Sequence, residues 1–342
     1  MVNLHMKNKR LKFVLIFLYI AVAVLFVLPS NFQAITPGNV TNVDTVFELK
    51  DTETSDNFFT VSVISYFRVT HFQKFLATFD KRIDLSKRTE YDESLSFSDT
   101  VKQGKISKES SINSSIIAAY EFSRKYQEEN HLTHIDPISI DYVYQGFITY
   151  YATNYLNIGD IIVKINNQSF SDYATQLEYL RSLIQTKDTI LFTLDDGKMI
   201  EIKESTSFIF YPKYLIEKTI PQLEVQKALL ASGGPSGGMI QTLSLVASLL
   251  KLNLQDLKIA GTGTIEMDAN YTIGQIGGIL QKTHTVIKNK MDYFIVPDYY
   301  RTSLDIEAIE MRKLSDKIKI IYVTNLEEAM ERLVDIYEEH IL

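Results

Sequence analysis

The sequence predicts an α+β protein in three parts: an N-terminal transmembrane helix, a compact unit of strands and one helix, and a C-terminal α/β domain. An unbroken run of 16 apolar residues at 13–28 indicates the first part. Strand and helix patterns alternate over residues 138–203, and glycine-rich loops lead into helical patterns in the last third of the chain. We place the boundaries at residues 1–12, 13–28, 29–137, 138–205 and 206–342.

Composition excludes several classes of protein. The 342 residues include 35 basic and 42 acidic side chains, a formal charge of −7, so no basic field favours binding to nucleic-acid phosphates. Apolar residues make up 45% of the chain, which excludes wholesale disorder. There is no cysteine, which excludes disulfides, thiolate zinc sites and cysteine nucleophiles.

The apolar run at 13–28 follows a basic segment that contains Lys7, Lys9, Arg10 and Lys12, and the next basic residue is Lys50. This asymmetry predicts a single-pass protein of the cell membrane, with a cytoplasmic N-terminus and the rest of the chain outside. A cleaved signal peptide is the alternative interpretation. Residues 29–33 contain no small-x-small cleavage site, so we favour an uncleaved anchor.

Residues 29–137 carry fewer signals. Asparagine, threonine, proline and glycine at 29–44 suggest a linker, and β-branched and aromatic residues at 58–69 predict a strand. An amphipathic stretch follows at 72–79. Residues 80–109 mix charges and serines, which predicts a solvated, partly mobile insertion. Ile112, Ile116, Ile117 and Tyr120 then mark a helix face that ends in a charged stretch near 125–130.

Residues 138–203 form the compact unit. A strand at 142–148 is interrupted by Gly146, and Gly159-Asp160 turns into a strand at 161–165. Ser171 is a candidate N-cap for a helix whose core side carries Leu177, Leu180 and Ile184. Strands at 189–194 and 198–203 close the unit across a hairpin turn at 196–197.

This order of elements, with Leu-x-x-Gly-Asp-x-Ile-x-x-Ile-Asn at 156–166, resembles a PDZ domain of the bacterial type. The resemblance implies that a peptide adds as a strand beside Gly146, Phe147 and Ile148, in the groove against the following helix. The alternative is a module that only spaces the next domain.

The C-terminal domain contains a candidate nucleophile. An apolar strand at 225–231 runs into Ser-Gly-Gly-Pro-Ser-Gly-Gly at 232–238, and a helical pattern begins with Met239. Such a loop aims free N–H groups at one point, which suits an anion or a developing oxyanion, and it presents Ser236 on a sharp turn. A phosphate-binding loop is excluded, because neither 233–238 nor 274–283 has a lysine directly after its last glycine, followed by serine or threonine.

A serine nucleophile needs a base, and Lys282 is the candidate. It lies on a predicted helix that runs to about residue 288 and shares a face with Gly278, Ile279 and Val286. Burial on this apolar face would lower the pKa of the lysine, as a general base requires. Taken alone, such a lysine also fits a snorkelling surface residue.

Three segments together resemble the proteolytic domain of Lon-type serine peptidases: Gly-Pro-Ser-Gly-Gly at 234–238, Thr-Gly-Thr-Ile at 262–265 and Ile-Gly-Gly-Ile-Leu-Gln-Lys at 276–282. With the anchor and the PDZ-like unit, the chain resembles membrane-anchored, PDZ-containing Lon-like peptidases that lack an ATPase module. The resemblance implies Ser236 as nucleophile, Lys282 as general base and Thr262 as its support. Gly237 departs from the alanine usual in the family. The expected oxyanion region is the backbone of Gly234, Pro235 and Gly237.

The sequence therefore predicts an ATP-independent serine endopeptidase that acts on peptides or proteins near the membrane, with no cofactor, metal, nucleotide or nucleic acid. The spacing of His131 and His134 lacks the context of a metal site. A catalytically silent PDZ-type adaptor is the second hypothesis, and a structural envelope protein is the third. Whether the chain forms a homo-oligomer stays open.

Overall fold

A mixed sheet of six strands lies at the centre of the larger part of the fold, in the order β15-β14-β11-β3-β1-β4. The computed structural model describes residues 2–50, 55–151, 153, 155–186, 189–203, 208–226, 233–252, 254 and 256–341. Strands β3, β11, β14 and β15 are parallel. Strand β1 pairs antiparallel with β3 on one side and with β4 on the other. Their bounds are Phe32–Asn42 (β1), Phe58–Tyr66 (β3), Asp84–Lys87 (β4), Ile259–Gly261 (β11), Tyr293–Pro297 (β14) and Lys319–Val323 (β15).

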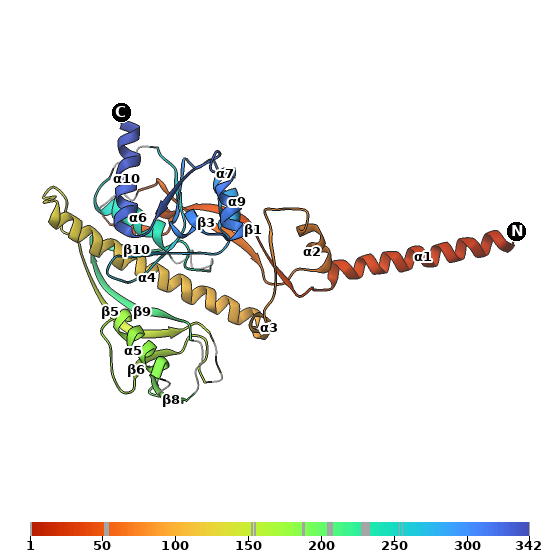
Figure 1. The fold of residues 1–342 in the computed structure, drawn as a ribbon, viewed down its shortest axis with the longest axis horizontal. Helices are drawn as coiled ribbons and strands as arrows, with labels where there is room; N and C mark the ends of the chain where they lie inside the picture. Colours follow the sequence, from red (N-terminus) through yellow and green to blue (C-terminus); the bar gives the residue numbers. More distant parts are fainter. Residues whose placement is uncertain are drawn as a thin grey trace.

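Helices cover both faces of this sheet (Figure 1). Side chains alternate along the strands, so Ile259 and Ile295 enter one core and Ala260 and Phe294 enter the other. The first core is shared with α4 (Phe97–Glu129), α6 (Gly238–Leu249) and α10 (Leu326–Ile341). The second core is shared with α7 (Ile279–Lys288) and α9 (Ile306–Arg312). The helices that carry Lys282 and follow Ser236 thus belong to an α/β/α sandwich.

N-terminal segments of the sequence contribute strands and helices to the sandwich. Residues 29–44, expected as a linker, contain β1, whose two edges pair with β3 and β4. The expected mobile insertion at 80–109 is also wrong, because it supplies β4, α3 (Glu90–Ser94) and the first turns of α4. Ser96 caps α4 in a reciprocal capping box with Asp99, a local signal that indicates an ordered helix start. Helix α2 (His71–Ala77) occupies the predicted amphipathic stretch.

A second sheet of five strands, in the order β8-β7-β6-β5-β9, forms the compact unit. Its strands are Ser139–Thr149 (β5), Ile161–Ile165 (β6), Ile190–Leu194 (β7), Met199–Ile202 (β8) and Phe210–Ile220 (β9), and its helix is Tyr173–Thr186 (α5). Phe147, Leu180 and Phe192 lie in its core. Asp172 rather than Ser171 caps α5, since its carboxylate accepts the Thr175 N–H. Because β9 completes this sheet, the unit extends past the predicted boundary at residue 205.

Short elements connect the two parts. Strand β2 (Phe47–Leu49) follows the single 3₁₀ turn Val43–Thr45 and pairs with β10 (Leu223–Val225). Strands β12 (Thr264–Ile265) and β13 (Ile273–Gly274) form a small hairpin, and α8 (Tyr299–Thr302) follows β14. Most of the strand predicted at 225–231, residues 227–231, lies outside the described part of the chain. Helix α4 packs against α6 on one side and β9 on the other, and so joins the sandwich to the compact unit.

The N-terminal helix α1 (Val2–Val27) extends away from the rest of the fold (Figure 1). Within the described part of the chain, none of the helices combines the length and apolar character that crossing a membrane requires. The prediction of a transmembrane helix at 13–28 is therefore wrong. The physical reason is length: at about 1.5 Å per residue the run of 16 apolar residues spans about 24 Å, short of a hydrocarbon core of about 30 Å. Lys12 and Arg10 directly precede the run.

Candidate active site

Ser236 lies in the turn that opens α6. The turn is closed by a hydrogen bond of 3.1 Å from the Gly238 N–H to the Pro235 carbonyl. The Ser236 carbonyl accepts the Gly263 N–H at 2.9 Å, and Met239 N–H donates to the Gly263 carbonyl at 3.0 Å. These bonds tie the turn to the loop that follows β11, so the backbone of the candidate nucleophile is held from both sides.

Helix α4 supports the same turn from outside the predicted motifs. The Gly234 N–H donates to the Gly104 carbonyl at 3.2 Å, and Ser111 Oγ donates to the Pro235 carbonyl at 2.9 Å. A Cβ on Gly233 would lie 3.0 Å from the Gly104 Cα, so glycine at both positions permits the close approach of helix and loop. One helical turn beyond Ser111, Ser115 Oγ donates to the Gly238 carbonyl at 3.0 Å.

The sequence motifs did not predict this support, because residues 80–109 were expected to form an insertion. The signal was the helical spacing of small residues at 104, 111 and 115, which continues the face predicted from Ile112 onward. Small side chains on one stripe allow another backbone to approach closely.

Lys282 lies in the second turn of α7 and is 2% exposed. Burial lowers its pKa to about 7; the nearby carboxylate of Glu307 acts in the opposite direction, and the charge of Lys108 lowers the pKa further. The neutral amine is therefore far more populated at pH 7 than it would be at the ordinary value of 10.5. The site thus holds an amine that can accept a proton near neutrality.

Thr262 connects the lysine to the serine turn. Its side chain is fully buried after β11, and its N–H donates to the Ile295 carbonyl at 3.0 Å. Lys282 Nζ donates to Thr262 Oγ1 at 2.9 Å, and Thr262 Oγ1 donates to the Ser236 carbonyl at 3.0 Å. The structure therefore joins the side chains of Lys282 and Thr262 to the backbone carbonyl of Ser236.

Comparison with family models decides the class of this site. Residues 206–335 match the model of the Lon protease (S16) C-terminal proteolytic domain. This match indicates a Lon-type serine endopeptidase. Comparison of the chain with curated proteins gives no match. The matched range contains Ser236, Thr262 and Lys282, but the Lon-type fold is completed here by β1, β3, β4 and α4, which precede that range.

The backbone donors for an oxyanion differ from those expected. Gly234 donates its N–H to Gly104, as described above, and Pro235 has no N–H, so neither supplies a donor. Within the described residues, the N–H groups of Ser236 and Gly237 have no hydrogen-bond partner. Of the three positions predicted for the oxyanion region, Gly237 alone keeps a free donor, and the N–H of Ser236 joins it.

The peptide-binding site predicted at Gly146, Phe147 and Ile148 is wrong. These residues pair with β9 on one side, and Phe147 and Ile148 pair with Ile162 and Ile161 of β6 on the other. Phe147 is fully buried in the core of the unit. A Cβ on Gly146, which has a φ of +129°, would lie 2.2 Å from the Ile162 carbonyl oxygen. The glycine therefore allows close strand packing, and both edges of this strand are occupied, so no peptide can add there.

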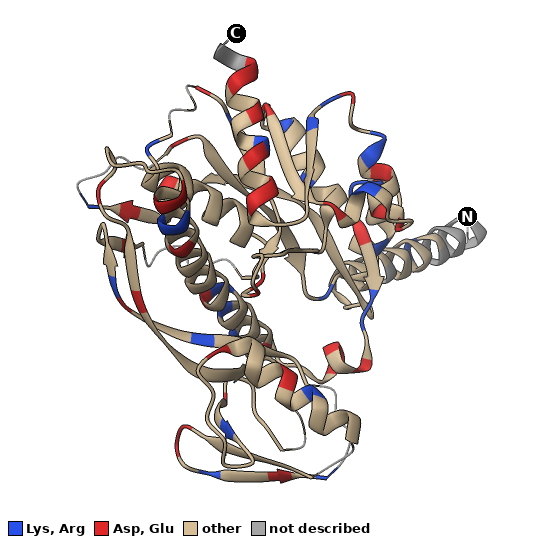
Figure 2. Ribbon diagram, turned by 60° about the vertical axis from the view of Figure 1, so that its left-hand side comes forward, with Lys and Arg blue, Asp and Glu red and all other residues tan. Residues whose placement is uncertain are grey.

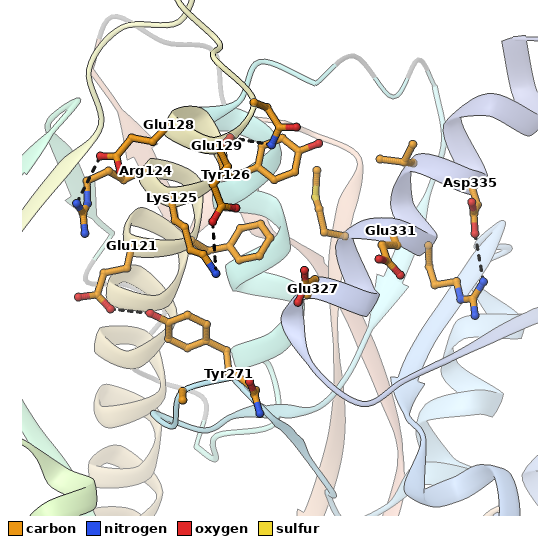
Figure 3. A pocket seen from close by; sticks show the side chains of 17 residues that line it. Glu121, Arg124, Lys125, Tyr126, Glu128, Glu129, Tyr271, Glu327, Glu331 and Asp335 are labelled. Carbon is orange, nitrogen blue, oxygen red and sulfur yellow. Dashed lines mark hydrogen bonds and ion pairs between the residues drawn. The ribbon is translucent and has the colours of Figure 1, made fainter.

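A cavity of about 990 Å³ lies between the C-terminal half of α4 and α10 (Figure 3), and its lining includes neither Ser236 nor Lys282. Its lining includes many acidic side chains, several of them on α10, whose acidic residues are visible in Figure 2. Tyr271, from the connection between β12 and β13, donates its hydroxyl to Glu121 of α4 at 2.6 Å within this lining. The bond supports the hairpin beside Thr262. Among the described residues, no group of three His, Asp or Glu side chains could hold a metal ion.

Proposed function

We propose that the peptidase uses Ser236 as nucleophile and Lys282 as general base, and that it cleaves peptides or proteins without a nucleotide cofactor. The observation that carries the proposal is the hydrogen-bonded path from Lys282 Nζ through Thr262 Oγ1 to the Ser236 carbonyl. A buried lysine with a pKa near 7 supports the role of base. The absence of a Gly-x-x-x-x-Gly-Lys-Ser/Thr motif from the sequence supports independence from ATP.

In the proposed mechanism, neutral Lys282 takes the proton of the Ser236 hydroxyl while the oxygen attacks the substrate carbonyl carbon. The tetrahedral intermediate then collapses, the C–N bond breaks, and Lys282 returns the proton to the leaving amine. Water hydrolyses the acyl-enzyme with the same lysine as base. Thr262 orients the amine throughout, as the third member does in catalytic triads.

The second hypothesis, a silent adaptor, is disfavoured by the cost of the site. Burying Lys282 to 2% exposure costs folding free energy. A protein without a catalytic role for this lysine would gain nothing in return. The peptide groove on which the adaptor depended is also closed, because both edges of the predicted binding strand are paired.

The test is hydrolysis of a library of fluorogenic peptides without nucleotide. Ser236→Ala and Lys282→Ala should each abolish cleavage, and the double variant should lose little more, because the two groups act as a unit. Lys282→Arg is the matched control for charge and should be inactive, since guanidinium stays protonated near neutrality. Activity in folded Ser236→Ala protein, or a requirement for added ATP, would contradict the proposal.

A further inference from the structure

A second lysine is buried near the dyad. Lys108 of α4 is 8% exposed, and burial lowers the pKa of its amine. Within the described residues it makes no hydrogen bond or ion pair, whereas the next residue on the helix, Glu109, pairs with Lys213 at 2.7 Å. Its Nζ is not fully enclosed, so the unpaired amine at the end of a buried stem can meet an arriving anion.

The helical period places Lys108 on the face of α4 that contacts the serine turn. Gly104 and Ser111, at minus four and plus three, both bond to that turn, one at Gly234 and the other at Pro235. Lys108 therefore lies between two contacts made with the residues directly before Ser236. Its charge also acts on Lys282, which agrees with a position close to the dyad.

The reaction creates one anion at this place. Attack by Ser236 turns the substrate carbonyl oxygen into an oxyanion, and the turn offers only the N–H groups of Ser236 and Gly237 as free backbone donors among the described residues. We propose that Lys108 is a further catalytic residue, whose ammonium donates a hydrogen bond to the substrate carbonyl oxygen as it becomes the oxyanion. This role rests on Ser236 being the nucleophile, as proposed above.

The step balances without another reactant. As the Ser236 Oγ–C bond forms, the π electrons of the carbonyl move to its oxygen, and the serine proton moves to neutral Lys282. Lys108 keeps its proton and stabilises the negative charge by a charge-assisted hydrogen bond. When the C–N bond breaks, the carbonyl reforms, Lys282 protonates the amine, and Lys108 is left as it began.

The experiment compares Lys108→Met and Lys108→Arg with Lys105→Met, which removes an exposed lysine from the same helix. Steady-state kinetics are measured on a neutral peptide and on the same peptide with acidic side chains, from pH 6 to 9. Loss of one oxyanion donor should lower kcat of Lys108→Met by roughly 10²- to 10³-fold with little change in KM. The loss should be equal for both peptides and should persist at pH 9. Lys108→Arg should recover part of the activity, and Lys105→Met should match wild type.

Thermal unfolding separates this role from a structural one. Because Lys108 lacks a partner, Lys108→Met should fold with a Tm equal to or above that of wild type. Failure of Lys108→Met to fold would overturn the proposal, as would wild-type kcat. A loss of kcat confined to acidic peptides would indicate that Lys108 binds a substrate carboxylate. Recovery of full kcat at pH 9 would indicate that Lys108 acts only through the pKa of Lys282. Either result overturns the proposal. If Ser236→Ala is inactive while Lys108→Met is fully active, the dyad stands and only this inference fails.

Discussion

Thr262 offers the sharpest test of the site, because one hydroxyl group makes both bonds between the lysine and the serine turn. Thr262→Val removes the acceptor for Lys282 Nζ at 2.9 Å and the donor to the Ser236 carbonyl at 3.0 Å. The Ser236 carbonyl keeps its bond from the Gly263 N–H at 2.9 Å, so the turn itself should persist. The main loss is therefore the orientation of the amine.

The magnitude follows from the bond that is lost. A hydrogen bond that involves a charged group contributes about 1.5–3 kcal/mol, and the loss of that amount in the transition state lowers kcat roughly 10- to 150-fold. Because Thr262 is fully buried and valine fills nearly the same volume, the free energy of unfolding should fall by only about 1–3 kcal/mol. The loss of activity should thus exceed the loss of folded protein at 25 °C.

The assay is kcat and KM on a fluorogenic peptide, with Tm measured on the same preparations. Thr262→Ser is the matched control, since it keeps the hydroxyl and removes only a methyl group, at about 1 kcal/mol of stability. It should retain kcat within a few-fold of wild type. If Thr262→Val is folded and its kcat lies within twofold of wild type across the pH range, the relay from Lys282 to Ser236 does not support catalysis.

Three further predictions follow from the same contacts. Because burial lowers the pKa of Lys282 to about 7, kcat should rise with pH through about 7. The pKa of Lys282 in the folded state lies below the unfolded value of 10.5, so the free energy of unfolding should rise with pH between about 7 and 10.5. Urea unfolding at pH 7 and pH 10 measures this rise, which should be smaller in Lys282→Met than in wild type. Gly146→Ala should lower the Tm by many degrees, because its Cβ would lie 2.2 Å from the Ile162 carbonyl oxygen. Gly197→Ala is the control: its φ is +84° but the space around it is open, so it should lower the free energy of unfolding by only about 1 kcal/mol. Equal Tm values in the two glycine variants would refute the packing argument. Ser111→Ala should cost about 1 kcal/mol of stability and lower kcat several-fold, since its hydroxyl holds the Pro235 carbonyl at 2.9 Å; unchanged kcat would show that α4 does not position the turn.

Local patterns were sufficient to predict the pieces of the candidate site. The spacing of glycines around Ser236 requires a tight turn before a helix, and α6 begins at Gly238 as that pattern indicates. The apolar neighbours of Lys282 at helical spacing predicted its burial on α7, which ends at Lys288. These properties depend on residues within a few positions of each other, which is the range over which helical periodicity and turn chemistry act.

Pairing between distant segments was decided only by the tertiary structure. Nothing in residues 29–44 says that they form the strand between β3 and β4, since a strand's partners are set by hydrogen bonds to chain far away in sequence. For the same reason the sequence pointed to a peptide groove at Gly146, Phe147 and Ile148, while β6 and β9 occupy both edges of that strand. Residues 80–109 carry too few apolar side chains to reveal a buried helix, because small and polar residues face the serine turn. The sequence by itself predicted the roles of Ser236, Thr262 and Lys282, and long-range packing decided that α4 lies against the turn that carries Ser236.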